Sequence, residues 1–194
     1  MHVEPIGNLR DARRLMRGFE EAVGVVSDPA WAMHGQARRL VHGGRLVGGY
    51  VLAPSRMLED SGVVPEGVIL TDRRASELMA LWVAAEVPEW GRLVLLRAIA
   101  EDVRKRKSQV VFGVAMTEKS VQLLSELLPD QLYEGPGAQP ELLPWLHVRR
   151  GFAPSPLKLR LRGWVARLRR RVVGRPKALV DTGAPGGAPR VSPR

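Results

Sequence analysis

The sequence of 194 residues contains no cysteine. This absence excludes disulfide bridges, thiolate metal ligands and a cysteine nucleophile. The four histidines, at positions 2, 34, 42 and 147, lack the close spacing of helical zinc motifs, so we expect no metal site. No apolar run approaches the roughly 20 residues that span a bilayer, and the N-terminus lacks the features of a secretory signal. The cytoplasm is therefore the expected location.

Acidic residues are scarce in one part of the chain. The whole sequence carries 30 Lys and Arg against 20 Asp and Glu, a net charge of +10. Residues 1–150 hold 19 of each sign, whereas residues 151–194 hold 11 basic residues and a single acid, Asp181. We therefore predict a neutral globular domain over residues 1–163 and a basic, largely disordered tail, rich in proline and glycine, over residues 164–194.

The basic tail admits three interpretations. Clustered arginines with interleaved Trp164 and Val165 are typical of a segment that contacts an anionic membrane surface. The same charge would also suit nonspecific binding to the phosphates of a nucleic acid. The third interpretation is that the tail binds neither.

The first half of the domain contains signals for one helix and one hairpin. Apolar residues recur at helical spacing over residues 9–23. The β-prone runs 37–42 and 45–54 are joined by Gly43 and Gly44, which supply positive φ without steric cost. These patterns predict an amphipathic helix followed by a β-hairpin.

Two nearly uncharged runs, 76–85 and 108–117, have the composition of strands covered on both faces. Between them, residues 93–107 place apolar side chains on one stripe and end in four consecutive cations, Arg104 to Lys107. Cations complement the dipole at the C-terminal end of a helix, so this stretch is predicted to be a helix.

The segment after the second buried run contains weaker signals of secondary structure. Thr117 is a candidate cap for a helix that stops at Pro129, and residues 130–135 form a candidate strand. Residues 140–156 are interrupted by prolines and are predicted to be irregular. Residues 157–162 alternate apolar and basic side chains, which predicts a half-buried last strand.

This order of elements resembles the GNAT superfamily of N-acetyltransferases, over roughly residues 1–163. In that superfamily a strand ending in valine is followed by a pyrophosphate loop and a long helix, and Val83 and the helix from about Gly91 match those places. The resemblance implies an α/β fold with a mixed, mostly antiparallel central sheet flanked by helices. It also implies acyl transfer from acetyl-CoA or another acyl-CoA to a small-molecule amine.

The loop before this helix departs from the glycine-rich pattern of the superfamily. It runs from Pro88 to Arg92 and keeps one glycine, Gly91. By the resemblance this loop binds the donor, and Arg92 is either a direct phosphate ligand or a solvated residue of the first helical turn. Trp82 and Trp90 flank the loop, and each either lines an acyl pocket or packs in the core.

The strand before the loop is also similar to that of the acyl-homoserine-lactone synthases and N-acyl amino acid synthases. Those enzymes carry Glu-x-x-Arg-Phe-x-Val there; Glu77 and Val83 match, whereas Ala80 and Leu81 replace the arginine and phenylalanine. They often take the acyl group from an acyl carrier protein, so the resemblance implies such a protein as an alternative donor. The basic helix end at residues 104–107 is the expected docking surface for it.

Acyl transfer to an amine requires a base, a donor group that polarises the thioester carbonyl, and an acid for the leaving thiolate. By the resemblance, Glu77 is the candidate base, the N–H groups of Trp82, Val83 and Ala84 are candidate donors if the two central strands diverge, and Tyr133 is the candidate acid. The structural alternatives are that Glu77 makes a surface ion pair and that Tyr133 packs in the core. The alternative function is a catalytically inactive GNAT fold that binds a partner.

Overall fold

The computed structural model describes residues 1–25, 27–54, 57–60, 62–65, 67–68, 74–138, 140 and 145–152. The tail predicted over residues 164–194 and the strand predicted over residues 157–162 lie outside the described residues. Within the described ranges, no helix is both long and apolar enough to cross a bilayer.

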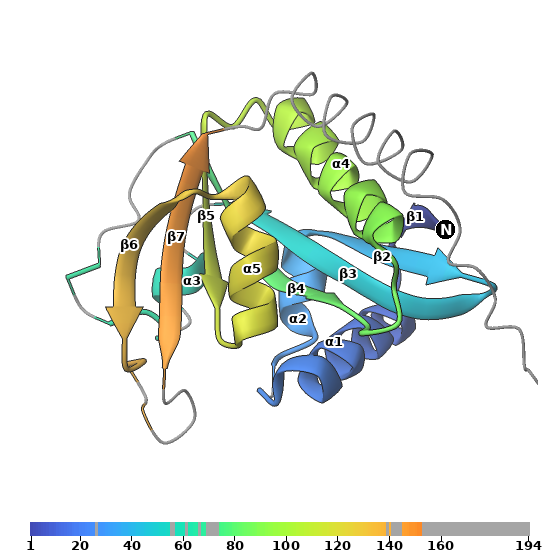
Figure 1. The fold of residues 1–194 in the computed structure, drawn as a ribbon, viewed down its shortest axis with the longest axis horizontal. Helices are drawn as coiled ribbons and strands as arrows, with labels where there is room; N and C mark the ends of the chain where they lie inside the picture. Colours follow the sequence, from blue (N-terminus) through green and yellow to red (C-terminus); the bar gives the residue numbers. More distant parts are fainter. Residues whose placement is uncertain are drawn as a thin grey trace, which may run out of the picture.

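The strands of the described chain form a single sheet, and helices lie between several of them in the sequence (Figure 1). In chain order they are β1 (His2–Pro5), α1 (Leu9–Val23), α2 (Ala30–His34), β2 (Gln36–His42), β3 (Arg45–Pro54), α3 (Met57–Asp60), β4 (Ala75–Val83), α4 (Glu89–Lys105), β5 (Val110–Ala115), α5 (Glu118–Leu127), β6 (Asp130–Gly135) and β7 (Leu146–Phe152). The sheet order is β1-β2-β3-β4-β5-β7-β6, and only the central pair, β4 with β5, is parallel. The mixed, mostly antiparallel sheet predicted from the sequence is confirmed.

Helices cover both faces of the sheet (Figure 1). One face is covered by α1 and α2, whose buried residues are Ala12, Leu15, Met16, Phe19 and Ala32. The other face is covered by α4 and α5, which bury Leu95, Leu96, Ile99, Val103, Leu123, Leu124 and Leu127. Because β4 lies in the middle of the sheet and is covered on both sides, nearly all of its residues are buried, as its nearly uncharged sequence predicted.

Local signals form the helix and the hairpin where the sequence predicts them. The Asn8 side chain accepts a hydrogen bond from the Asp11 backbone N–H at 2.8 Å and caps α1, and Gly24 closes the helix with φ of 81°. The turn between β2 and β3 uses Gly43 and Gly44 with φ of 56° and 77°. Positive φ at both central residues matches the twist of the hairpin strands.

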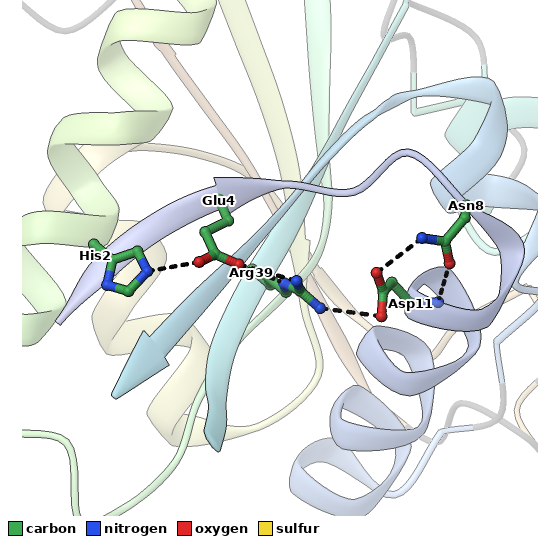
Figure 2. A network of polar contacts seen from close by, with 5 residues as sticks. All are labelled: His2, Glu4, Asn8, Asp11 and Arg39. Atoms are coloured by element: carbon green, nitrogen blue, oxygen red, sulfur yellow. Dashed lines mark hydrogen bonds and ion pairs between the residues drawn. The ribbon is translucent and has the colours of Figure 1, made fainter. Parts of the chain in front are cut away.

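Strand β1 was not predicted, and a polar network holds it beside β2 (Figure 2). His2 Nε2 lies 2.6 Å from Glu4 Oε1, and Arg39 of β2 donates to Glu4 Oε2 at 3.0 Å. A second nitrogen of Arg39 lies 3.0 Å from Asp11 of α1. The hydrogen bonds from His2 and Arg39 stabilise the carboxylate and lower the pKa of Glu4 below its ordinary value.

The prediction that residues 140–156 are irregular is wrong for residues 146–152. That stretch forms β7, which pairs with both β5 and β6. Leu146 and Val148 are fully buried on the face covered by α1, and His147, which lies between them, is half-buried. Apolar and polar residues alternate at the start of this segment, but the prolines on either side obscured the pattern. Pairing with two strands outweighs the tendency of those prolines to interrupt regular structure.

A buried ionic cluster fastens α4 to β2 and β3. The Arg38 guanidinium donates to both oxygens of Asp102, at 2.7 and 2.8 Å, and the Tyr50 hydroxyl donates to one of them at 2.8 Å. The Asp102 side chain is only 2% exposed. Burial and the neighbouring carboxylate raise the pKa of Tyr50, and the hydrogen bond to Asp102 raises the pKa of Arg38. Both groups therefore keep their protons at physiological pH.

Helix α4 ends in a Schellman motif with an unusual residue. The Lys107 N–H donates to the Arg104 carbonyl at 3.0 Å, and the Ser108 N–H donates to the Val103 carbonyl at 3.2 Å. Lys107 occupies the left-handed position of this motif, with φ of 57°. Glycine is the usual residue there because a side chain costs about 1–2 kcal/mol in that conformation.

We therefore expect Lys107→Gly to stabilise the fold by about 0.5–1 kcal/mol, since relief of the left-handed strain exceeds the added entropy of the unfolded chain. Lys105→Gly is the matched control, because Lys105 lies two residues earlier, within α4. This variant is expected to destabilise the fold by about 1 kcal/mol. Urea denaturation of the two variants measures the difference. A loss of stability in Lys107→Gly would show that the Lys107 side chain supports the fold.

Candidate active site

The two central strands diverge. β4 and β5 are paired from Ala75 with Val110 to Leu78 with Gly113, and the pairing ends there, although β4 continues to Val83. The divergence of the two strands that the resemblance requires is confirmed. Backbone polar groups beyond Leu78 on this side of β4 are thus available to a ligand in place of a neighbouring strand.

A bulge in β4 accompanies the divergence. On the β3 side, Gly49 pairs with Trp82 and Val51 pairs with Met79, so β4 has one more residue than β3 between these positions. Within it, Ala80 has φ of 47°. An extra residue bends the strand and increases its local twist, which directs the end of β4 away from β5.

A cavity of about 220 Å³ lies at the open end of the divergence. Its walls come from the end of α1, the end of β4, the loop into α4, and the first turns of α5. The lining residues are Ala22, Val23, Leu81, Trp82, Val83, Ala85, Arg92, Thr117, Ser120, Gln122 and Leu123. The cavity is thus mainly apolar, with several polar groups and a single cation, Arg92, among its described lining residues.

One backbone donor at this cavity follows from the strand pairing. The Ala84 N–H donates to the Val47 carbonyl at 2.9 Å, so it is occupied. Successive N–H groups of an antiparallel strand point to opposite sides, and Val83 therefore directs its N–H toward β5 and the opening. By the same alternation the Trp82 N–H points toward β3. Of the three predicted backbone donors, Val83 is the one placed at the cavity.

Trp82 lines the cavity and packs in the core as well, which combines the two interpretations of its sequence position. Its ring lies against Gly18 of α1, where any side chain would overlap the indole. The Trp82 side chain is buried, and its Nε1 atom has no hydrogen-bond partner within the described residues. A buried N–H without a partner is costly, so this atom is a donor suited to a bound acceptor group.

The start of α4 lacks a phosphate cradle. Pro88 is the N-cap residue of the helix; it has no backbone N–H to donate to a phosphate, and its side chain makes no capping hydrogen bond. Glu89 places a negative charge in the first turn. A side chain at Gly91 would meet Met1 and Val87, so this glycine is needed for packing. Trp90 is exposed and does not line the cavity, whereas Arg92 does. Arg92 is therefore the one cationic side chain of the described segment 88–92 that lines the cavity.

The structure brings neither catalytic candidate to the lining of the cavity. Glu77 is fully buried on β4, one residue before the last pair with β5, at the closed end of the divergence. Tyr133 lies on the edge strand β6, separated from β5 by β7, and its hydroxyl donates to the Pro136 carbonyl at 2.9 Å. Glu77 is thus adjacent to the opening along the strand, and Tyr133 is remote from it.

Several lining residues were not identified from the sequence. Thr117 and Ser120 form a capping box, in which the Ser120 hydroxyl accepts from the Thr117 N–H at 3.0 Å and donates to the Thr117 carbonyl at 2.8 Å. The sequence signal for this cap was recognised only as the start of a helix. Ala22 and Gln122 carry no chemical signal, and only the packing of α1 and α5 places them at the cavity.

The docking prediction assumed that the basic end of α4 lies near the loop. The structure places it at the other end of the helix. Arg104 to Lys107 follow Arg92 by at least 12 residues, which is about 18 Å at the rise of an α-helix. In the part of the chain that the structure describes, no group of three or more His, Asp or Glu side chains is placed to hold a metal ion.

No protein-family model matches the sequence, and no curated protein matches it significantly. Solved structures do match. A ribosomal-protein-alanine N-acetyltransferase from Brucella melitensis is 20% identical, covers 78% of this chain and 99% of its own, and has a TM-score of 0.54. An N-acyl amino acid synthase from uncultured soil microbes is 15% identical, with coverage of 80% and 97% and a TM-score of 0.55.

A third match was solved with acetyl-CoA. This yncA protein, a putative acetyltransferase from Salmonella typhimurium, is 14% identical, covers 80% of this chain and 95% of its own, and has a TM-score of 0.55. Each of the three matches covers almost the entire length of the known protein, with a TM-score above 0.5. At these identities the likeness shows the fold alone. The chain therefore has a divergent GNAT fold, that of the GNAT acetyltransferases.

Proposed function

We propose that the protein is an acyltransferase that moves an acyl group from a pantetheine thioester, in acyl-CoA or on an acyl carrier protein, to an amine. The observation that carries the proposal is the divergence of β4 and β5 beyond Leu78 and Gly113, with a cavity at its open end. The thioester lies in this opening, where the Val83 N–H donates to its carbonyl oxygen. That bond strengthens as negative charge develops on the oxygen during attack by the amine.

The proposed reaction is direct transfer. The neutral amine attacks the thioester carbon, the bond from that carbon to sulfur breaks, the nitrogen releases a proton to water as the amide forms, and the leaving thiolate takes a proton from solvent. Glu77, through water, is the proposed acceptor of the proton that the ammonium form must lose. Tyr133, predicted as the acid, lies on the edge strand outside this cavity and donates to the Pro136 carbonyl, so in this proposal the thiolate takes its proton from solvent.

The volume of the cavity supports a short acyl group. Pockets that enclose drug-sized ligands occupy about 300–1,000 Å³. The described walls here enclose about 220 Å³, with apolar groups from Leu81, Val83 and Leu123. Acetyl and propionyl groups, together with the thioester sulfur, suit this space better than long chains.

Thermal denaturation with acyl donors tests the proposal. A donor at 100 times its dissociation constant should add about 2.7 kcal/mol of stability and raise the melting midpoint by several degrees. The probes are acetyl-CoA, propionyl-CoA, dodecanoyl-CoA and an acyl carrier protein loaded with an acetyl group. Mass spectrometry of mixtures with a panel of amines then identifies the acylated acceptor. No midpoint shift with any of these donors would exclude acyl transfer.

Arg92 separates the two donor classes. If it contacts the CoA pyrophosphate, Arg92→Gln should weaken acetyl-CoA binding about tenfold, because a hydrogen bond to a charged group contributes about 1.5–3 kcal/mol. Binding of acetyl-pantetheine, which lacks the pyrophosphate, should not change. Arg97→Gln, on an exposed face of the same helix, is the control. Equal weakening of both ligands by Arg92→Gln would remove the proposed phosphate contact.

Glu77→Gln tests the proposed base. Turnover should fall about 100-fold, within the usual contribution of general base catalysis, while the midpoint shift with acetyl-CoA stays the same. The residual rate should rise with pH as more of the amine acceptor loses its proton in solution. Unchanged turnover would exclude Glu77 as the base.

A second candidate function is binding without catalysis. It is favoured by the start of α4, where Pro88 and Glu89 replace a phosphate cradle. Under this proposal the fold binds a partner, and the basic tail contributes contacts to an anionic membrane surface or a nucleic acid. Donor binding without turnover of any amine in the panel would support it.

A further inference from the structure

A second cavity lies at the other end of the central strands. It occupies about 490 Å³ beside the starts of β4 and β5 and the end of α4, whereas the acyl cavity lies at the ends of those strands. Its lining includes three cations, Arg74, Arg106 and Lys107, and two hydroxyls, Ser76 and Ser108. None of its lining residues is acidic, within the part of the chain that the structure describes. The described lining thus carries the positive charges of Arg106 and Lys107 and no acidic side chain.

Lys107 lies in this wall at a backbone position where glycine would have less steric strain. Lys107 is held in the left-handed region at φ of 57°, and the Schellman motif at the end of α4 depends on that conformation. Sterically unfavourable backbone positions that carry a side chain are concentrated at binding sites. The strained lysine therefore marks this wall as a candidate binding site.

The two serines leave one hydroxyl hydrogen for a ligand. Ser76 Oγ and Ser108 Oγ lie 2.6 Å apart, and either atom can be the donor. Each hydroxyl has one hydrogen, and their mutual bond uses only one of the two. Ser108 is 8% exposed and lines the cavity. When Ser76 donates to Ser108, the Ser108 hydrogen is directed to an acceptor other than Ser76.

The carbonyl groups at the end of α4 oppose an anion here only in part, because three of them accept hydrogen bonds. The Asp102, Val103 and Arg104 carbonyls accept from the N–H groups of Arg106, Ser108 and Lys107 respectively. Their partial negative charges are therefore partly offset, and the positive charges of Arg106 and Lys107 lie beside them in the lining of the cavity.

We propose that this cavity binds the phosphate group of a small phosphomonoester. Arg106 and Lys107 neutralise its charge, and the Ser108 hydroxyl donates to one of its oxygens. Arginine, lysine and hydroxyl donors together match the several acceptor oxygens of a phosphate. The volume exceeds what a phosphate alone occupies, so the remainder of the ligand also lies in the cavity. The site is separate from the acyl cavity and does not depend on the proposed acyl transfer.

Melting midpoints in the presence of inorganic phosphate and AMP test this site, with sodium chloride at matched ionic strength as the reference. The full chain should show a saturable rise with either phosphate probe. Lys107→Gly should weaken binding at least tenfold without lowering the midpoint in chloride. Arg104→Gln removes the same charge from the same helix end at a position outside the lining, and should change the affinity less than twofold.

Ser108→Ala keeps both cations and should weaken phosphate binding several-fold. Tighter binding of AMP than of inorganic phosphate identifies an organic phosphomonoester, whereas equal affinity identifies the free anion, which overturns the phosphomonoester assignment. Equal weakening by Lys107→Gly and Arg104→Gln, or a rise that chloride reproduces, overturns the site. In that case the cations only complement the end of α4. Acetyl-CoA binding should be the same in Lys107→Gly, so the two cavities are tested independently.

Discussion

Asp102→Ala is expected to destabilise the fold by about 3–5 kcal/mol, the usual loss when one partner of a buried ion pair is removed. Asp102 is almost completely buried, and it accepts two hydrogen bonds from Arg38 and one from Tyr50. Its removal leaves a cation and a hydroxyl without their partner beneath α4. Domains are stable by only about 5–15 kcal/mol, so this loss is a large fraction of the total.

Urea denaturation measures this change. Glu101→Gln, at the neighbouring position of the same helix, is the control, since its pair with Arg97 is exposed and contributes about 0.3–0.5 kcal/mol. Replacing the whole cluster, Arg38→Met and Tyr50→Phe with Asp102→Leu, should recover most of the stability because no buried charge or unpaired hydroxyl remains. A loss below about 1 kcal/mol in Asp102→Ala would show that water reaches the pair and that the cluster does not fasten α4.

Ala22→Trp is expected to reduce acyl transfer by about 100-fold or more, since even a small displacement of bound reactants has an effect of that size. Ala22 is exposed at the end of α1, and it lines the acyl cavity. An indole at this position reaches into a space of about 220 Å³ and competes with the thioester. Because the alanine is exposed, the fold should tolerate the larger side chain.

Glu21→Trp is the matched control, since Glu21 is exposed on the same turn of α1 and does not line the cavity. Both variants should keep the melting midpoint of the unmodified protein, and only Ala22→Trp should lose the midpoint shift with acetyl-CoA. Full donor binding and turnover in Ala22→Trp would place the reaction outside this cavity. This outcome would contradict the proposed function and leave the fold assignment unchanged.

The elements that could be predicted from the sequence have their causes within a few residues. Asn8 caps α1, the Gly43-Gly44 pair turns the hairpin, and Thr117 begins α5, each by a bond or backbone angle inside one short segment. Such interactions form in the same way whatever surrounds them. The nearly uncharged composition of β4, with Glu77 as its one charged residue, also predicted its burial, since strands covered on both faces are rich in apolar residues.

Strand β7 could not be predicted because its stability comes from distant partners. Pairing with β5 on one side and β6 on the other supplies the hydrogen bonds of residues 146–152, and neither partner is recognisable from this segment. Prolines at 140, 144 and 154 obscured the alternation around it. Strand β1 was missed for a similar reason, since Glu4 is held by Arg39 of β2 (Figure 2).

The candidate site divides in the same way. Val83, Trp82 and Arg92 follow from the order of elements, because the end of one strand and the start of the next helix are adjacent in the chain. Ala22 and Ser120 come from α1 and α5, and only their packing brings them to the same cavity. Gly91 matched a phosphate-loop glycine, but contact with Met1 and Val87 explains it by packing.

The sequence by itself determined the caps, the hairpin, the buried central strands and the balance of charge in the first 150 residues. These are consequences of local conformational preference and of burial, which act on each segment separately. Only the tertiary structure decided which residues meet at the end of β4, that Tyr133 lies away from them, and that Lys107 and Ser108 line a second cavity. Such contacts join residues far apart in the chain, so no local preference specifies them.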